Sequence, residues 1–301
     1  MSVQYQGEII VSRQNRRVVE LVKLDDRRAR EASRRFRFDG LKLLSEAIGR
    51  GVELDAVYLR ESTAERVAMR LAEMGGHALA DACPVFRIAD NLFERISQEN
   101  APEGVITVAK YPDGCHRMMP VYHRATDARR EAPIILLESV RDPLNVGAII
   151  RSAAALGVGE LILSADCADI YHPRTVRAAM GPLFSMPITR VEDMVGSIRA
   201  LQNEGRRLYA AALDHTAARL GSFDLRTGGS AAPGTVGAPC AVGAPCAVGA
   251  PCAVIGNEGH GLTPSVVAAC DQSVYIPMQA GTESLNAGVA AALIMWELCR
   301  A

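Results

Sequence analysis

Three segments in the second half of the chain combine glycine with polar side chains, as ligand-binding loops do. The first, Asp142–Arg151, follows a short apolar run and leads into a predicted helix. We expect Asn145 to be the N-cap of that helix, Gly147 to permit close approach of another backbone, and Arg151 to lie in the second turn. A helix N-terminus attracts anionic groups, although an asparagine there is usually only a cap.

The second segment, Val254–Leu262, follows an apolar strand and has three glycines within six positions: Gly256, Gly259 and Gly261. Such glycines can wrap a backbone closely around a ligand, but most of them only turn the chain. The Glu258 carboxylate could bind a ribose hydroxyl or hold an arginine. We expect His260 to be an ordinary loop residue rather than a ligand or base.

The third segment runs from Ile276 to Leu293 and contains a glycine loop followed by Ser284, which is placed where a helix N-cap belongs. The helix after it has one apolar stripe, formed by Leu285, Val289, Leu293 and Trp296. A packed helix with an ordinary cap explains the stripe. It does not explain why a glycine-rich loop precedes this helix as well as following the strand that ends near Ile255.

The elements around these segments alternate between strand and helix. Strands are predicted at 134–137, 160–163, 207–212, 253–255 and 273–276, and helices at 146–156, 191–204 and 284–298. This rhythm predicts an α/β domain, residues 132–301, with a parallel sheet covered on both faces. Ligands bind such sheets outside the carboxyl ends of the strands.

The first half predicts a smaller α/β domain, residues 1–110, with helices at 41–51 and 63–74 and strands at 54–59 and 105–109. Residues 111–131 contain Pro112, Gly114 and Pro120 and are the expected linker, with a short element inside it. Residues 236–253 repeat Val-Gly-Ala-Pro-Cys-Ala three times. We interpret the repeat as an inserted extended loop whose third copy feeds a core strand.

The segment Arg13–Arg37 has ten basic residues and four acids, a local excess of six charges, and its apolar residues have helical spacing. A solvated helix face explains this run on its own. A phosphate-contacting surface is the sharper alternative, because clustered guanidinium groups bind phosphates. On that alternative the RNA-binding candidates are Arg13, Arg16, Arg17, Arg34 and Arg35.

Composition limits the remaining function classes. The 301 residues are 49% hydrophobic with a net charge of -1, so a nucleic-acid surface must be local. No apolar run reaches the ~18 residues of a membrane span, and the N-terminus has no secretory pattern. The eight cysteines contain no C-x-x-C pair, which favours reduced thiols in a cytoplasmic protein and no bound metal.

Together the three segments resemble the SpoU (TrmH) family of the SPOUT RNA 2′-O-ribose methyltransferases. The matching motifs are N-x-G-x-x-x-R from Asn145 to Arg151, I-G-N-E-G-x-G-L from Ile255 to Leu262, and I-P-M-x-x-x-x-E-S-L-N from Ile276 to Asn286. The first domain is similar to the substrate-binding domain of many members, with Phe36–Gly40 in place of the usual F-x-x-E-G. Where members commonly have S-L-N-V-S-V-A, this chain reads S-L-N-A-G-V-A.

The resemblance implies a C-terminal trefoil knot, a homodimer whose active sites draw on both subunits, and S-adenosylmethionine bound between the second and third motifs. It implies that Arg151 is the catalytic arginine and that four residues shape the site: Asn145, Glu258, Ser284 and Asn286. The implied cofactor contacts are Gly256, Asn257, Gly261, Ile276, Met278 and Leu285.

The implied reaction moves a methyl group from a sulfonium to a ribose hydroxyl, which needs positioning and removal of a proton. A guanidinium with a pKa above ~12 is a poor base, so we expect Arg151 to grip phosphate and polarise the hydroxyl. A separate first domain favours ribosomal RNA over transfer RNA. One alternative is a non-catalytic RNA-binding protein that keeps the knot. The other is a nicotinamide-dependent enzyme, which would need the motif G-x-G-x-x-G; Gly157–Gly159 lacks the third glycine of that motif.

Overall fold

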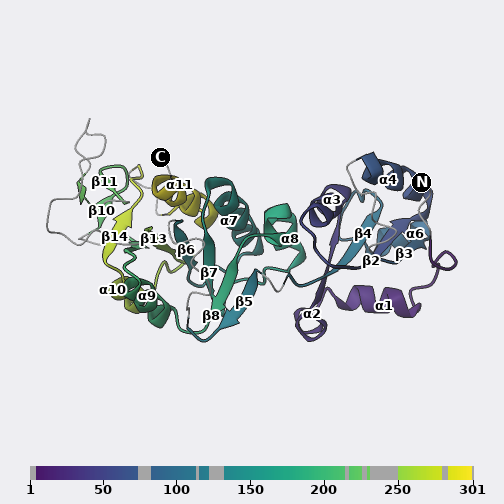
Figure 1. The fold of residues 1–301 in the computed structure, drawn as a ribbon, viewed down its shortest axis with the longest axis horizontal. Coiled ribbons are helices and arrows are strands. Elements are labelled where there is room, and N and C mark those ends of the chain that lie inside the picture. Colours follow the sequence, from purple (N-terminus) through teal and green to yellow (C-terminus); the bar gives the residue numbers. More distant parts are fainter. Residues whose placement is uncertain are drawn as a thin grey trace. The chain divides into compact units, whose positions relative to one another are not determined.

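The computed structural model describes residues 5–73, 83–112, 115–121, 132–213, 217–225, 229–230, 250–279 and 284–299. The chain forms two compact units, each with its own sheet (Figure 1). The first unit contains residues 1–114 and also 169–185, and the second contains residues 115–168 and 186–301. None of the helices in the described part of the chain has the length and apolar character needed to span a bilayer.

The first unit contains a four-stranded mixed sheet in the order β1-β4-β2-β3. Its strands are β1 (Arg35–Asp39), β2 (Leu54–Arg60), β3 (Val85–Ile88) and β4 (Val105–Lys110). β4 is antiparallel to both its neighbours, whereas β2 and β3 are parallel. The helices are α1 (Arg16–Lys23), α2 (Arg27–Ser33), α3 (Leu41–Gly49), α4 (Ala64–Glu73) and α6 (Asp90–Ile96).

The predicted helices at 41–51 and 63–74 and the strands at 54–59 and 105–109 are confirmed within two residues. β1, β3 and α6 were not predicted. The strand β1 reads Arg-Phe-Arg-Phe-Asp, and its central Arg37 is buried although it is charged. The hydrophobic pattern did not indicate this strand because a guanidinium occupies a core position. There the Arg37 guanidinium donates two hydrogen bonds to the Asp25 carboxylate.

The arginine-rich segment does not form one continuous helix. The Asp26 carboxylate accepts a hydrogen bond from the Ala29 backbone at 3.0 Å and starts α2 after a break that follows Lys23. Arg34 then ends α2 in the left-handed conformation, with φ of 52°. The chain therefore forms two short helices and a strand where the spacing indicated a single amphipathic helix.

Residues 169–185 were not assigned any structure, yet they pack with the first unit. They contain α8 (Pro173–Ala179) and a 3₁₀ turn, Gly181–Phe184. The ring of Tyr171 lies 4.8 Å from that of Phe36 and is stacked on Tyr111 at 3.7 Å. This aromatic cluster joins segments that are far apart in the sequence.

The second unit has an eight-stranded sheet in the order β10-β14-β9-β13-β6-β7-β8-β5, and every paired strand in it is parallel. The predicted parallel sheet is therefore confirmed. Its strands are β5 (His116–Met119), β6 (Ile134–Leu137), β7 (Glu160–Ser164), β8 (Ile188–Val191), β9 (Leu208–Ala211), β10 (Ala218–Arg219), β13 (Cys252–Ile255) and β14 (Gln272–Tyr275). β5 is the short element expected inside residues 111–131. A separate two-stranded sheet pairs β11 (Phe223–Asp224) with β12 (Gly229–Ser230).

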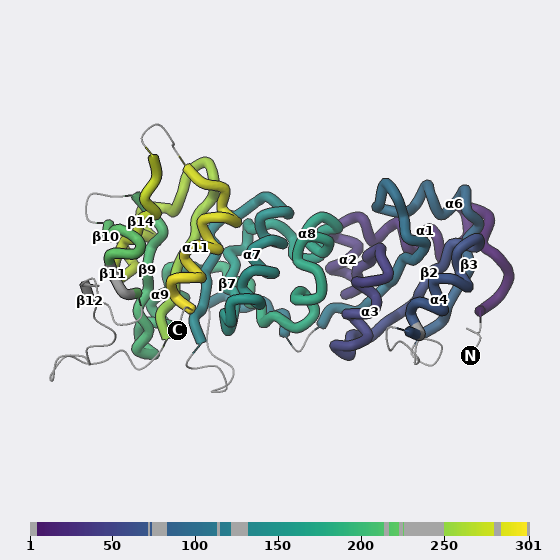
Figure 2. Tube along the Cα trace, turned by 90° about the horizontal axis from the view of Figure 1, so that it is seen from above, coloured from purple at the N-terminus to yellow at the C-terminus, as the bar shows by residue number. Residues whose placement is uncertain are grey.

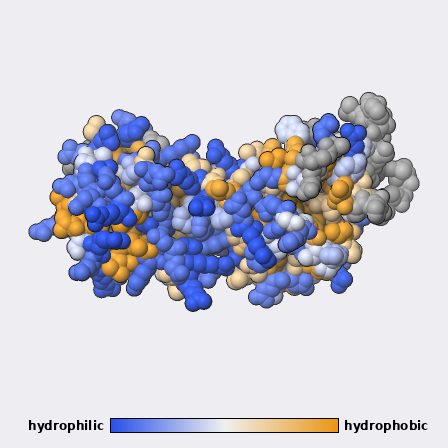
Figure 3. Space-filling model, turned by 180° about the vertical axis from the view of Figure 1, so that it is seen from behind, coloured by the Kyte–Doolittle hydropathy of each residue, from blue (hydrophilic) through white to orange (hydrophobic). Residues whose placement is uncertain are grey.

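Helices cover both faces of the large sheet, as alternating elements require. α7 (Pro143–Leu156) and α11 (Ala287–Cys299) pack side by side on one face, and α9 (Met194–Asn203) and α10 (Pro264–Ala269) pack together on the other (Figures 1 and 2). In β13, Cys252 and Val254 point toward α9 and α10. Figure 3 shows one surface of the molecule, which is largely hydrophilic with separate apolar patches.

The third copy of the hexapeptide repeat enters the sheet, as predicted. Cys252 and Ala253, its last two residues, begin β13, and the buried Arg206 side chain donates hydrogen bonds to the carbonyls of Ala250 and Ala132, each at 3.0 Å. Burial is the main reason that the pKa of the Cys252 thiol rises to about 11, so this thiol stays protonated at neutral pH. Residues 236–249 of the repeat lie outside the described residues.

Candidate functional site

A cavity of about 680 Å³ opens at the carboxyl ends of β9, β13 and β14. Its wall is formed by residues 211–213 after β9, 255–262 after β13, 274–276 and Met278 around the end of β14, and the start of α11. In a parallel sheet the carboxyl ends of neighbouring strands share one edge, so loops distant in the sequence meet there. This is the edge at which the sequence places a ligand.

The loop after β13 is folded tightly on itself at Gly256. A Cβ atom added there would lie 2.4 Å from the Gly261 carbonyl carbon and 2.6 Å from its oxygen, which are backbone atoms with no freedom to rotate away. Asn257 and Gly261 exchange backbone hydrogen bonds across the loop at 3.1 and 2.9 Å. Gly261 has a φ of +67°, a conformation that favours glycine. The glycine spacing of this motif thus has a direct steric cause.

A chain of side-chain hydrogen bonds connects the three motifs. The Asn286 amide donates to Asn145 Oδ1 at 2.8 Å, and the Asn145 amide donates in turn to the Glu258 carboxylate. Asn145 is only 7% exposed, and Glu258 lines the cavity. Because an amide donates at one end and accepts at the other, Asn145 joins Glu258 and Asn286 in one fixed arrangement.

Two predicted helix caps are wrong. The N-cap of α7 is Asp142, whose carboxylate accepts from the Leu144 backbone at 3.0 Å, and Asn145 lies inside the first turn. α11 begins at Ala287, and the Asn286 side chain, rather than that of Ser284, accepts from the backbone of the next turn. Both asparagines therefore form side-chain hydrogen bonds with residues of the other motifs, which the residue spacing in the sequence did not reveal.

The loop after β6 is attached to the loop after β13. The Glu138 carboxylate accepts hydrogen bonds from the backbone and hydroxyl of Thr263 at 2.9 and 2.7 Å, and the Ser139 carbonyl accepts from the Asn257 amide at 2.8 Å. Ser139 has a φ of 56°, which is unusual outside glycine. Its hydroxyl donates to Asp166 at 2.7 Å.

The Asp166 carboxylate stabilises this conformation of Ser139. Burial by itself raises the pKa of the Asp166 carboxyl, but hydrogen bonds from Ser164, Ser139 and Arg141 together lower it to about 2. The group is therefore ionised at neutral pH and accepts all three bonds. It contacts Ser139 and Arg141, which lie in the loop before α7.

Comparison with known protein families decides the relationship of this chain. The SpoU rRNA methylase family matches residues 132–296, and an MRM3-like substrate-binding domain matches residues 15–107. The chain belongs to the SpoU rRNA methylase family.

Relatives of this SpoU family member match it over most of its length. The chain is 26% identical over 289 residues to the 23S rRNA (guanosine(2553)-2′-O)-methyltransferase RlmP of Bacillus subtilis, covering 96% of this chain and 98% of that one. The SpoU methyltransferase AviRb of Streptomyces viridochromogenes, solved with the cofactor AdoMet, has a TM-score of 0.72 at 25% identity, covering 95% and 98% of the two chains. A solved RNA 2′-O ribose methyltransferase shares the fold, with a TM-score of 0.74 at 24% identity over 97% and 98%.

The structure brings most of the predicted SpoU site residues together. The six predicted cofactor contacts all line the cavity, and so do Glu258, Ser284 and His260. The sequence analysis missed several other apolar residues of the wall, namely Ala211–Leu213, Pro264, Val267 and Val274. The positions after β9 could have been found from the rule that ligands lie at strand carboxyl ends, whereas those on α10 carry no local signal.

Arg151 is not brought to the cavity of its own chain. It lies on α7 with its side chain exposed, and it is absent from the described residues that form the cavity wall. Asn145, at the start of the same helix, reaches Glu258. The two ends of the first motif therefore face different surroundings within one chain.

The five predicted RNA-binding arginines differ in their partners. Arg16 pairs with Glu20 at 2.9 Å and Arg35 pairs with Asp55 at 2.7 Å. Arg17 lies over the Phe86 ring and Arg34 lies over the Tyr111 ring, with guanidinium-to-centroid distances of 4.0 and 5.2 Å. No ion pair is recorded among the described residues for Arg13.

Two other arginines of the same segment belong to the core. Arg30 is 2% exposed, bonds to the carbonyls of Leu24 and Asp25 at 2.8 Å, and pairs with Asp169 at 2.6 Å. Arg37 is 3% exposed and pairs with Asp25. The basic surface is therefore smaller than the charge count of this segment indicated.

Proposed function

We propose that this protein is an S-adenosylmethionine-dependent RNA 2′-O-ribose methyltransferase that acts on ribosomal RNA in the cytoplasm. The observation that carries the proposal is the hydrogen-bonded chain Asn286–Asn145–Glu258, which unites the three motifs beside one cavity. Membership of the SpoU rRNA methylase family supports the same reaction. Names of relatives such as RlmP support ribosomal RNA as the substrate.

The cavity has the properties that S-adenosylmethionine requires. Its volume of about 680 Å³ falls within the range of small-molecule sites. Ile255, Ile276 and Leu285 provide apolar contacts for a flat ring, while the tight turn at Gly256 brings backbone groups to the wall. Asn257, Gly261 and Met278 complete the set of residues that would hold the cofactor.

When bound, the cofactor supplies a methyl group on a sulfonium centre. The ribose hydroxyl that accepts it must be held in line and must lose its proton. Asn145 donates to the Glu258 carboxylate and accepts from Asn286, which directly precedes α11, and Ser284 lines the cavity. We assign to Arg151 the grip on the RNA phosphate and the polarisation of the hydroxyl, because a guanidinium stays protonated.

The proposal includes a homodimer in which Arg151 of one copy reaches the cavity of the other. Within its own chain Arg151 lies away from the cavity. The apolar stripe on α11 is not packed in the single chain: Val289, Leu293 and Trp296 are 49%, 41% and 56% exposed. Exposed apolar side chains aligned on one helix are typical of an interface, and a second copy would cover them.

The proposal also includes the trefoil knot. Its support is that β13, a late strand, lies between β9 and β6, and that α11 returns to pack on α7. Knotted chains are rare among protein folds, so this part of the proposal is tested by a direct trace of the chain through its loops.

Arg151→Ala is the decisive variant for this function. We expect it to bind S-adenosylmethionine as the wild type does, measured by calorimetry, and to transfer no methyl to ribosomal RNA, measured with a radiolabelled donor. Wild-type protein that binds the donor but leaves no 2′-O-methyl mark on any RNA would instead be a non-catalytic RNA-binding protein. Equal turnover by the variant would remove Arg151 from the mechanism.

A further inference from the structure

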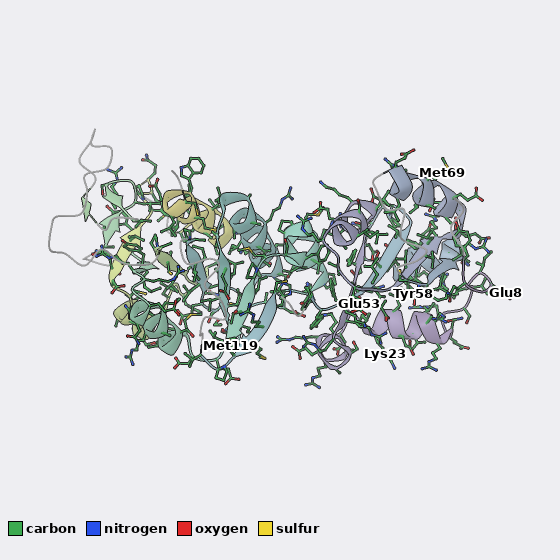
Figure 4. The ribbon with its side chains drawn as sticks, in the orientation of Figure 1. Glu8, Lys23, Glu53, Tyr58, Met69 and Met119 are labelled. Carbon is green, nitrogen blue, oxygen red and sulfur yellow. The ribbon has the colours of Figure 1, made fainter. Side chains whose placement is uncertain are left out.

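A second cavity, of about 490 Å³, lies in the first unit between an N-terminal arm, the start of α1 and the edge strand β3. The arm runs along β3, with bridges from Tyr5 to Val85 and from Ile10 to Ile88. Between the two bridges the arm has four residues, whereas β3 has only two. The arm therefore bulges outward opposite Phe86, and the cavity occupies the bulge; Figure 4 labels Glu8 on this arm.

Two planar groups, the Phe86 ring and the Arg17 guanidinium, line this cavity, and the Tyr58 ring packs against Phe86 in a tilted arrangement. Tyr58 and Phe86 are directly opposite in the paired strands β2 and β3, with ring centroids 5.4 Å apart. The Arg17 guanidinium lies 4.0 Å from the Phe86 centroid and also lines the cavity. Phe86 is 3% exposed, while Arg17 is exposed. The Phe86 ring thus covers one side of the guanidinium, while the Arg17 side chain remains exposed to solvent.

The remaining lining is polar and of mixed charge. Asn15 and Ser12 line the cavity at the start of α1, and the Asn15 side-chain oxygen already accepts from the Arg17 backbone at 3.0 Å. Glu8, on the N-terminal arm, adds a negative charge to the lining. A phosphate would be repelled by that carboxylate, whereas a neutral planar ring could stack on Arg17 and offer donors to acceptor oxygens.

We infer that this cavity binds one unpaired nucleobase of the RNA substrate, stacked on the outer face of Arg17. The inference rests on the proposed function for the presence of RNA and assigns Arg17 a contact with a base instead of a phosphate. Arg13 and Arg16 lie four residues and one residue before Arg17 and can hold the flanking phosphates. Stacking on an arginine plane is a common way for proteins to bind single-stranded RNA.

The test compares the full-length wild type with Arg17→Lys, which keeps the positive charge and removes the planar surface. Binding is measured by fluorescence anisotropy with two probes: a dodecamer of cytidine and a dodecamer of the same backbone without bases. We expect the variant to bind the cytidine dodecamer about 5- to 100-fold more weakly and the baseless dodecamer equally well. Arg66→Lys, an exposed residue on α4 of the same unit, is the matched control and should change neither affinity.

Three outcomes overturn the inference: equal affinity of wild type and variant for the cytidine dodecamer, the same loss on both probes, or no binding of that dodecamer by the wild type up to about 1 mM. Methyl transfer to ribosomal RNA is assayed separately. If the protein methylates RNA but Arg17→Lys does not weaken cytidine binding, the proposed nucleobase site is wrong and the proposed function stands. If Arg17→Lys weakens cytidine binding but the wild type transfers no methyl group, the nucleobase site stands and the proposed function is wrong.

Discussion

The cavity of the second unit and the basic surface of the first unit are formed by different kinds of groups. The cavity depends on backbone and on one buried amide: Gly256 packs tightly against the Gly261 backbone, and Asn145 is 7% exposed. The basic surface depends on long exposed side chains, such as Arg16, which is 91% exposed where it pairs with Glu20. Buried groups tolerate one arrangement only, whereas exposed ion pairs contribute little and can rearrange.

The same contrast is found among the arginines of the arginine-rich segment. Arg27 and Arg30 are three residues apart on α2, and both form ion pairs. Arg27 meets Glu31 in solvent, while Arg30 is enclosed with Asp169 and two backbone carbonyls. Residues of one type therefore stabilise the fold or face the solvent according to their surroundings. The following variants test how far this contrast extends.

The largest effect is expected for Arg30→Ala, which leaves Asp169 and two carbonyls without their donor. Breaking a buried pair in this way costs about 3–5 kcal/mol of unfolding free energy. Arg27→Ala, on the same helix, should cost less than about 1 kcal/mol. Urea denaturation of both variants measures the contrast, and similar losses for the two would mean that burial does not separate their roles.

Gly256→Ala is expected to weaken S-adenosylmethionine binding by about 10- to 100-fold, because overpacking of a rigid site costs about 1–3 kcal/mol. Its new methyl would meet backbone atoms of Gly261. Gly259→Ala is the control, since a Cβ there lies 3.4 Å from a single side-chain oxygen. Calorimetric titration of both variants decides the point; unchanged affinity in Gly256→Ala would show that the loop does not contact the cofactor.

Asn145→Asp should lower methyl transfer about tenfold at pH 8, since it removes the donor to Glu258 and sets two carboxylates together. Neighbouring carboxylates raise the pKa of one of them, so a shared proton should restore the hydrogen bond and part of the rate as the pH falls toward 6. Asn203→Asp, at the exposed end of α9, should match the wild type. A variant whose relative rate stays constant with pH would contradict this account.

The smallest effect is expected for Asp166→Asn, because Asp166 is 45% exposed and its bonds are weakened by solvent. The folded pKa of Asp166 is lowered to about 2, so its contribution to stability is present above about pH 4 and is lost as the pH falls toward 2. The difference in unfolding free energy between wild type and variant should stay below about 1 kcal/mol at pH 7 and shrink below pH 4. A difference that grows on acidification would mean that Asp166 is not the group responsible.

The sequence predicted the large parallel sheet and the cavity wall well because their signals are local. Ile134–Leu137 is a run of apolar residues buried on both faces, and each residue is fully or nearly fully buried. The third repeat copy could be assigned to β13 because only that copy is followed by Ile255 and Gly256. Glycine and strand patterns act over a few residues, so they can be interpreted without knowing the fold.

The interpretation failed where a polar side chain has a distant partner. Asn145 and Asn286 have the chemistry of caps, but the bond between them spans 141 residues, and this contact determines what each one does in the site. Arg37 was counted as surface charge because its partner, Asp25, comes into reach only when β1 joins the sheet.

The amino-acid sequence by itself determined the class of the fold, the three motifs and their family, because glycines, apolar runs and motif spacing have the same meaning wherever they occur. Only the tertiary structure decided which arginines are surface and which are core, which asparagine caps which helix, and that Arg151 lies away from its own cavity. These depend on side chains from remote segments and on exclusion of water. Both arise only when the chain has packed.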